Sequence, residues 1–309
     1  MRLKQICVLW LLLILVMPGH GQQTAEDWVE LGVALVMQGR YTEAMQSFDE
    51  AIWINPEYAP AWKCKGDALY DQGKFADAAS ATRVESGRIA HRRGNFADAI
   101  LAYDEAIRLD PEYTAAWKSK GDALAAIGRT TEAMVAYDEA IRIDPNLSSA
   151  WYKKGNLLYY QGNRNDALQA YEESVRLDPS FAPAWNGKGN ALKNQGRHSA
   201  ALVAYDEAIN LYPNYVDAWF GKSFTLRDLD RTDEAEAAWF VAYVLREGVN
   251  TFIKYLGDED WRKRHFAAET LGDIGNQKAI GPLRNLVLND ENEEVRATSA
   301  KALEKIEAR

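Results

Sequence analysis

Residues 182–213 read APAWNGKGNALKNQGRHSAALVAYDEAINLYP, and the same pattern returns along most of the chain. With Ala182 counted as the first position of a repeat, the fourth position is tryptophan, the eighth glycine and the thirty-second proline. Equivalent residues recur 34 positions apart: Trp117, Trp151, Trp185 and Trp219; Gly121, Gly155 and Gly189; Pro111, Pro145, Pro179 and Pro213. A fixed period of this length is typical of stacked helical hairpins.

Each repeat carries the pattern of two helices. The first runs from Trp185 past Leu192 and breaks near Gly196, and the second presents Ala201 and Tyr205 on one face at helical spacing. Small residues at the eighth, twentieth and twenty-seventh positions let the two backbones approach, and aromatic rings at the fourth and twenty-fourth positions fill the remaining volume. The proline ends the second helix because it cannot continue the hydrogen-bond ladder.

These residues and this period resemble the tetratricopeptide repeat. The resemblance implies an all-α fold, a right-handed superhelical α-solenoid in which the first helix of every repeat lines a groove. About seven repeats are expected over residues 25–247. The last one departs from the pattern, since Ser223 and Asp230 replace two glycines.

The period fails after the second repeat. Gly87 follows Gly66 by 21 residues instead of 34, so the second repeat is interpreted as truncated near residues 79–80. No proline occurs between Gly73 and Gly94, and the stretch is rich in residues that helices tolerate. The sequence therefore predicts one continuous helix over residues 74–93, which would break the groove there.

The period changes again in residues 248–309. Asp258, Arg264, Ala268, Leu271 and Ile274 recur 32 residues later as Asp290, Arg296, Ala300, Leu303 and Ile306. This segment resembles HEAT repeats, closest to the short variety named after phycobilisome lyases. The resemblance implies that the aspartate and arginine six residues apart tie neighbouring hairpins together. We expect the segment to act as a polar cap on the end of the array.

Residues 1–21 differ from the rest of the chain. Arg2 and Lys4 precede an uninterrupted apolar run over residues 6–17, which Pro18 and Gly19 break. This layout is typical of a secretory signal peptide, and the run is short for a spanning helix. Two alternatives stay open, export with cleavage and retention as an N-terminal membrane anchor. Either one predicts a secreted or cell-envelope location.

The composition excludes several function classes. A net charge of -9 argues against nucleic-acid binding, which needs clustered Lys and Arg. The four histidines are scattered and Cys64 stands alone, so neither a metal site nor a cofactor site is expected, and the chain is predicted not to be an enzyme. The sequon at Asn146 allows either glycosylation or a helix-capping turn.

The expected function is an interaction scaffold that binds protein or peptide partners in the groove. The resemblance places positions two, five, nine, twelve and thirteen of each repeat in that groove. The predicted binding residues are Tyr70, Lys118, Asp122, Tyr152, Asn156, Tyr159, Tyr160, Asn190, Lys193, Phe220 and Phe224. Aromatic rings beside amides suit an extended peptide. The alternatives are a structural spacer of the cell envelope and a non-catalytic regulatory subunit of an enzyme complex.

Overall fold

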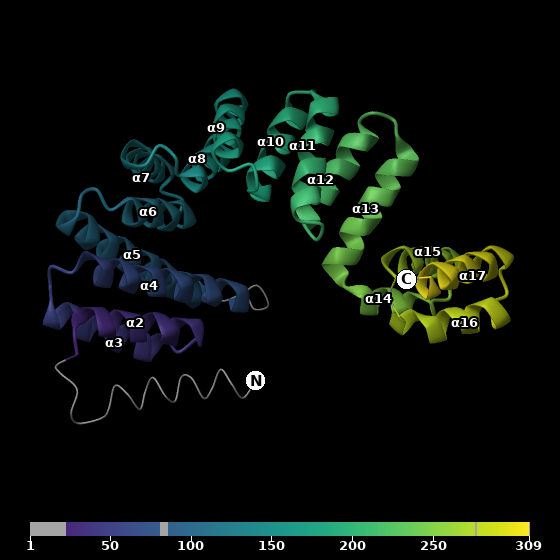
Figure 1. Ribbon diagram of the computed structural model, residues 1–309, viewed down its shortest axis with the longest axis horizontal. Helices are drawn as coiled ribbons and strands as arrows, with labels where there is room; N and C mark the ends of the chain where they lie inside the picture. Colours follow the sequence, from purple (N-terminus) through teal and green to yellow (C-terminus); the bar gives the residue numbers. More distant parts are fainter. Residues whose placement is uncertain (1–22, 81–85, 276, 309) are drawn as a thin grey trace. The chain divides into compact units, whose positions relative to one another are not determined.

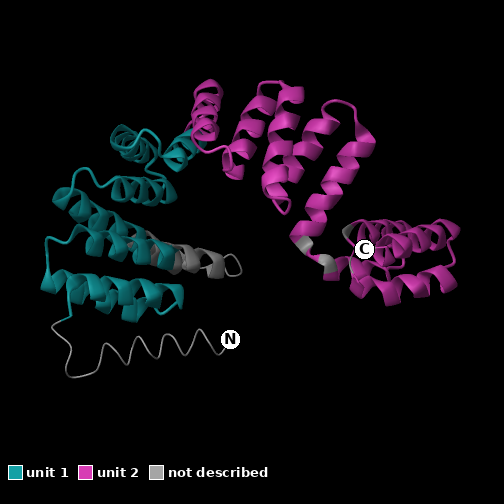
Figure 2. Ribbon diagram, viewed as in Figure 1, with its two compact units in different colours: residues 1–157 teal, residues 158–309 magenta. Residues whose placement is uncertain are grey.

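The computed structural model describes residues 23–80, 86–275 and 277–308, and every regular element in these ranges is a helix (Figure 1). The predicted all-α class is therefore confirmed, whereas the predicted leader, residues 1–21, lies outside the described residues. The chain forms two compact units, an N-terminal unit of residues 1–157 and a C-terminal unit of residues 158–309 (Figure 2).

The N-terminal unit is built from helical hairpins. Its helices are α2 (Ala25–Met37), α3 (Tyr41–Ile54), α4 (Ala59–Ser80), α5 (Ser86–Leu109), α6 (Thr114–Ala126), α7 (Thr130–Ile143) and most of α8 (Ser148–Tyr160). Helices α2 and α3, α4 and α5, and α6 and α7 pack in pairs.

The C-terminal unit continues with hairpins of the same kind and then changes. The helices are α9 (Arg164–Leu177), α10 (Ala182–Asn194), α11 (His198–Leu211), α12 (Val216–Arg227), α13 (Thr232–Glu247), α14 (Val249–Tyr255), α15 (Trp261–Ile274), the 3-10 turn η1 (Gln277–Ala279), α16 (Ile280–Asn289) and α17 (Glu293–Glu307). Helices α10 and α11 pack as one pair, α12 and α13 as the next, and α15 and α17 face each other near the end of the chain.

A glycine packed against an aromatic ring lies inside several of the hairpins, as the sequence predicts. The Tyr137 ring of α7 is buried, and it lies so close to α6 that a Cβ atom built on Gly121 would come within 2.6 Å of it. Tyr205 lies against Gly189 in the same way. Only a residue without a side chain permits this approach, and the ring fills the space between the two backbones.

Replacing Gly189 with alanine should lower the free energy of unfolding by about 1–3 kcal/mol, because the added Cβ would lie 2.7 Å from the Tyr205 ring. Gly281 is the matched control, since nothing lies within 4 Å of a Cβ at that helical position. Gly281→Ala should be neutral or stabilise the chain by up to about 1 kcal/mol. Urea unfolding followed by circular dichroism measures both, and equal values for the two variants would contradict the close packing.

The tryptophans at the fourth position of the repeats reach the joints between repeats, and Trp117 and Trp219 also pack against buried clusters. Trp117 Nε1 donates to the backbone oxygen of Pro111 at 2.9 Å, and Trp185 Nε1 donates to that of Pro179 at 2.9 Å. The same contact recurs at Trp62, Trp151 and Trp219. The 34-residue register of tryptophan and proline therefore reflects a hydrogen bond that fixes the start of one repeat on the end of the previous one.

A lysine three residues after each of these tryptophans makes two further contacts at the same joint. Lys120 Nζ lies 5.2 Å from the centre of the Trp117 ring and 2.6 Å from Asp104 Oδ1 on the preceding helix. Lys65, Lys154, Lys188 and Lys222 repeat the arrangement. Cation–π contact and an ion pair on one amine contribute modestly at each exposed joint.

Helices α4 and α5 form one long hairpin, so the predicted continuous helix over residues 74–93 is wrong. A Cβ built on Gly66 would lie 2.5 Å from the Tyr103 ring, and one on Gly73 would lie 3.0 Å from the Phe96 ring. On a single helix Gly73 and Phe96 would stand about 34 Å apart at 1.5 Å per residue. Residues 81–85, between the two helices, lie outside the described residues.

The sequence is interpreted as a truncated second repeat followed by a third repeat in this region. The structure has a single long hairpin there instead. Gly66 and Tyr103 are 37 residues apart, whereas Gly121 and Tyr137, which make the same contact, are 16 apart. Helix α4 has 22 residues against 13 in α6, and α5 has 24 against 14 in α7. The change of period is thus an insertion of 21 residues that lengthens both arms.

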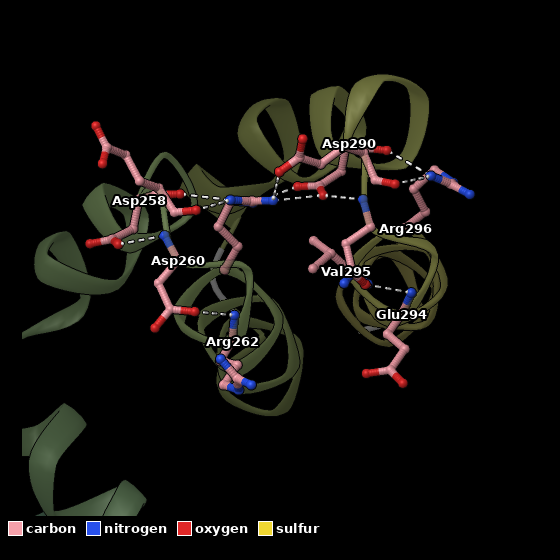
Figure 3. Close-up of polar contacts among 11 residues, drawn as sticks. Asp258, Asp260, Arg262, Asp290, Glu294, Val295 and Arg296 are labelled. Carbon is pink, nitrogen blue, oxygen red and sulfur yellow. Dashed lines mark hydrogen bonds and ion pairs between the residues drawn. The ribbon is translucent and has the colours of Figure 1, made fainter.

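An arginine–aspartate ladder joins the last hairpins, as the resemblance to HEAT repeats implies (Figure 3). Arg264 donates from Nε and Nη2 to the two carboxylate oxygens of Asp290, at 2.7 and 2.9 Å, and from Nη1 to the backbone oxygen of Asp258 at 2.9 Å. Arg296 donates to the backbone oxygen of Asp290 at 2.7 Å. The Arg264 and Asp290 side chains are only 10% and 2% exposed.

Helix α13 shares its core with the C-terminal segment. Phe240 and Val244 of α13 belong to one buried cluster with Phe252 of α14 and Leu271 of α15. The Phe240 and Phe252 rings meet edge to face at 5.4 Å. Residues of the segment after residue 248 therefore cover an apolar side of α13, and its role as a cap stays a prediction.

Candidate functional site

Asp122 is the centre of the predicted groove residues in the N-terminal unit. Lys118 Nζ, one turn earlier on α6, lies 2.9 Å from Asp122 Oδ2, and Lys153 Nζ of α8 lies 3.2 Å from Oδ1. The Tyr137 hydroxyl donates to Oδ1 at 2.8 Å. The structure therefore brings predicted residues Lys118 and Asp122 together and adds Lys153 and Tyr137.

Opposing effects act on the Asp122 carboxyl, whose side chain is 12% exposed. Burial alone raises its pKa, but the charges of Lys153 and Lys118 and the hydrogen bonds from Lys118 and Tyr137 together lower it. The carboxylate thus stays ionised and its lone pairs are used within the protein. The main role of this site is to hold α6 and α8 together, and Asp122 has little capacity left to accept hydrogen bonds from a ligand.

The long hairpin repeats this arrangement. The Tyr103 hydroxyl donates to Asp67 Oδ1 at 2.9 Å, and Lys63 Nζ lies 2.6 Å from Asp67 Oδ2. Burial is the main cause that raises the pKa of Tyr103, followed by the Asp67 charge. Because the contact survives the 21-residue insertion, the groove side of α4 keeps the geometry of an ordinary repeat.

The other predicted residues of the N-terminal unit are partly buried. Tyr70 packs its ring 5.3 Å from that of Phe96, and burial raises its pKa. Tyr152 and Asn156 of α8 are half-buried. The Asp122 charge is the second cause that raises the pKa of Tyr70, so this ring lies near the Asp122 site.

The predicted residues of the C-terminal unit form a more accessible surface. Tyr159 and Tyr160 meet edge to face at 5.7 Å, and Tyr160 is 84% exposed. The Nδ2 amide of Asn194, on α10, donates to the Tyr159 hydroxyl at 2.6 Å. The hydrogen bond ties the end of α8 to α10 and leaves the Tyr160 ring in solvent.

A row of rings and cations continues this surface across α10, α12 and α13. Lys193 Nζ lies 5.2 Å from the centre of the Phe224 ring, and Phe224 stacks on Phe220 at 6.4 Å. The Arg246 guanidinium lies 5.3 Å from the Phe220 ring and 5.6 Å from that of Tyr243. We call the set Tyr159, Tyr160, Asn190, Lys193, Asn194, Phe220, Phe224, Tyr243 and Arg246 the aromatic row.

Asn190 offers a hydrogen-bond donor in this row. Its Oδ1 accepts from the Tyr205 hydroxyl at 2.7 Å, which fixes the orientation of the amide. Within the part of the chain that the structure describes, Nδ2 of Asn190 makes no hydrogen bond. The amide can therefore donate to a backbone carbonyl of an extended partner, as predicted for this residue.

The sequence analysis missed Arg246 and Tyr243 because both belong to a second helix, whereas the family pattern places only first helices in the groove. Their spacing from Trp239, at four and seven residues, is a helical stripe that the sequence does show. Trp239 stacks on Tyr243 at 5.2 Å.

No group of three His, Cys, Asp or Glu residues that could hold a metal ion occurs among the described residues. Cys64 is a free, half-buried thiol whose pKa is raised by burial. None of the described helices is both long enough and apolar enough to cross a membrane.

Comparison with known families agrees with this geometry. The tetratricopeptide repeat family matches residues 84–148 and 152–215, with related repeat profiles over residues 32–73 and 204–237. HEAT repeats match residues 226–308. An Arabidopsis thaliana thioredoxin that contains tetratricopeptide repeats is 35% identical over 85 residues, 23% of this chain and 12% of that protein. The match thus spans only a small part of each protein.

A solved structure shows the same fold. PilF of Pseudomonas aeruginosa superposes with a TM-score of 0.59 at 15% identity, over 79% of this chain and 97% of that one. MamA of Desulfovibrio magneticus RS-1 gives a TM-score of 0.46 at 22% identity, over 57% of this chain and 96% of that one. The repeat pattern, the hairpins and the family matches agree, and the chain belongs to the tetratricopeptide repeat family, with HEAT repeats at its C-terminal end.

Proposed function

We propose that this protein is an exported, non-catalytic scaffold that binds a protein or peptide partner on the aromatic row of its C-terminal unit. Protein–protein interaction is the common role of tetratricopeptide repeats. The observation that carries the proposal is the exposure of rings in a row of fixed geometry, with Tyr160 84% and Phe224 42% exposed.

The chemistry of the row indicates the kind of partner. Exposed aromatic rings bury apolar side chains well and lose little conformational entropy on binding. Lys193 has no carboxylate within ion-pair distance among the described residues, so its amine is available to an acidic group of the partner. Together with the Asn190 donor, these features suit an extended segment that combines apolar and acidic side chains.

Replacing Tyr160 and Phe224 together with alanine should abolish capture of the partner. Interface aromatics often contribute 2 kcal/mol or more each to the binding free energy, so each replacement should weaken the affinity on the order of thirtyfold. A pull-down from the source cells with the full chain as bait measures this. Trp53→Ala is the matched control, since Trp53 is 80% exposed but belongs to α3. Partners retained by the double variant would favour a spacer role instead.

Export is the part of the proposal that rests on the sequence alone. The charged start at Arg2 and Lys4 and the apolar run after it support it. N-terminal sequencing of the protein recovered from each cell fraction tests it, and a cytoplasmic chain that begins at Met1 would contradict it.

A further inference from the structure

A second surface of the C-terminal unit, away from the aromatic row, is hollowed between α13 and α15. The cavity has a volume of about 720 Å³. Its apolar lining includes Phe240, Val241, Val244 and Leu245 of α13 and Phe266 of α15. A hollow of this size is large enough to bury several apolar side chains of a ligand.

Carboxylates stand on both walls of this cavity. Asp233 and Glu236 come from α13, and Glu269 and Asp273 come from α15. No lysine or arginine is among its lining residues, and His265 is the one lining histidine, with Nδ1 3.0 Å from the Thr298 hydroxyl. The hollow therefore combines an apolar floor with a negative rim, which attracts cations.

One lysine of the chain already shows how a cation docks on this rim. Lys305 Nζ lies 2.5 Å from Asp273 Oδ1, with both side chains more than half exposed. Glu269 stands one helical turn before Asp273, and Asp233 and Glu236 stand on the facing helix. These three exposed carboxylates make no ion pair with any described residue.

The hollow and the aromatic row use different faces of α13. Glu236, Phe240 and Val244 follow each other at four-residue spacing and line the hollow. Arg246 lies about 120° around the helix axis from the middle of that stripe and contacts Phe220 of α12, whereas Tyr243 lies between the two, about 60° from the stripe. A ligand in the hollow would therefore not compete directly for the Phe220 and Phe224 rings.

We propose that this hollow binds a basic amphipathic segment of a partner protein, an apolar stripe flanked on both sides by lysine or arginine. The apolar side chains of such a segment would be buried on Phe240, Val241 and Phe266, and its cations would pair with Glu236 and Glu269 on the two walls. Burial of apolar surface supplies affinity, and the paired charges select a basic partner and speed the encounter. The proposal does not depend on binding at the aromatic row.

The test uses the full chain and a fluorescein-labelled amphipathic helix of leucine and lysine, about 14 residues long, in a fluorescence anisotropy titration. Two further peptides serve as controls: a scrambled peptide of the same composition, which keeps the charge but loses the stripe, and one with glutamate in place of lysine. We expect the amphipathic basic peptide to bind at least about tenfold more tightly than either control, with affinity that falls as salt rises.

Charge reversal then locates the site. Glu236→Lys with Glu269→Lys should weaken binding at least about tenfold, because two attractions become two repulsions. Both residues are exposed, so folding should be unaffected. Glu207→Lys on α11 is the matched control, since Glu207 is equally exposed but does not line the hollow. Phe224→Ala should leave this binding unchanged.

Three results would overturn the proposal. The first is equal affinity for the stripe and scrambled peptides, which would show general attraction of an acidic protein for cations. The second is a loss of peptide affinity in the Glu207→Lys variant equal to that in the variant with Glu236→Lys and Glu269→Lys. The third is self-association of the chain that excludes the peptide, which sedimentation would reveal and which would assign the hollow to a second copy.

Discussion

Arg264→Ala should lower the free energy of unfolding of the C-terminal HEAT segment by about 3–5 kcal/mol, the usual cost of removing one partner of a buried ion pair. Arg264 and Asp290 are 10% and 2% exposed, so the Asp290 carboxylate would lose its two charge-assisted hydrogen bonds without gaining water. The backbone oxygens of Asp258 and Glu259 would also lose their donor.

Urea unfolding, with hydrogen exchange of α15, α16 and α17 to locate the loss, measures the effect. Lys305→Ala is the control, because its pair with Asp273 is exposed and should contribute less than about 1 kcal/mol. Equal effects of the two variants would show that the ladder does not hold the hairpins together.

The same pair makes the stability of this segment depend on pH. The hydrogen bonds from Arg264 are the main cause that lowers the pKa of Asp290. A carboxyl whose folded-state pKa is depressed stabilises the fold fully above its unfolded-state pKa, about 3.9, and loses this contribution as pH falls through the folded-state value. The native chain should therefore lose stability below about pH 4 more steeply than Arg264→Ala does.

A chain that ends at Glu247 should aggregate and lose its cooperative melting transition. The cut removes Phe252, Leu271 and their neighbours, which share one buried cluster with Phe240 and Val244 of α13. The apolar face of α13 would then be exposed over several turns, and exposed patches of this kind promote association. Light scattering and calorimetry of the shortened chain measure both effects.

Phe252→Ala in the full chain is the companion variant, because it weakens the same cluster without an open end. Phe252 is fully buried, and its removal should cost about 3–5 kcal/mol. A shortened chain that stays soluble and melts like the full chain would show that the segment folds as an independent module.

Most of the hairpin geometry could be predicted from the sequence. The glycine at the eighth position and the tyrosine at the twenty-fourth are set by the close approach of two backbones, which leaves few residue types possible. The Asp–Arg spacing of the HEAT segment was equally informative, because the bidentate pair of Arg264 and Asp290 needs these residues at fixed points of consecutive hairpins.

The insertion could not be predicted because it imitates a repeat. Residues 73–78 read GKFADA and residues 94–99 read GNFADA, 21 residues later. Either copy fits the start of a second helix equally well by period and residue type. Only contacts decide between them, and Gly66 against Tyr103 selects the later copy.

Predicting the site was limited by a similar problem. The family pattern identified Lys193, Phe220 and Phe224 by position, but it could not show that Asp122 is occupied by Lys118, Lys153 and Tyr137. The pattern also omitted Arg246, whose packing on the Phe220 ring depends on how α13 lies against α12. Which polar groups remain available to a ligand is a property of contacts between repeats.

The most direct measurement of the proposed function is site-specific photo-crosslinking in the source cells. A benzophenone amino acid is placed at position 160, at position 224 or, as control, at position 53, and crosslinked peptides are identified by mass spectrometry. Binding on the aromatic row predicts one partner segment that crosslinks to positions 160 and 224 and not to position 53. No crosslinked partner at 160 and 224, or the same yield at all three positions, would contradict it.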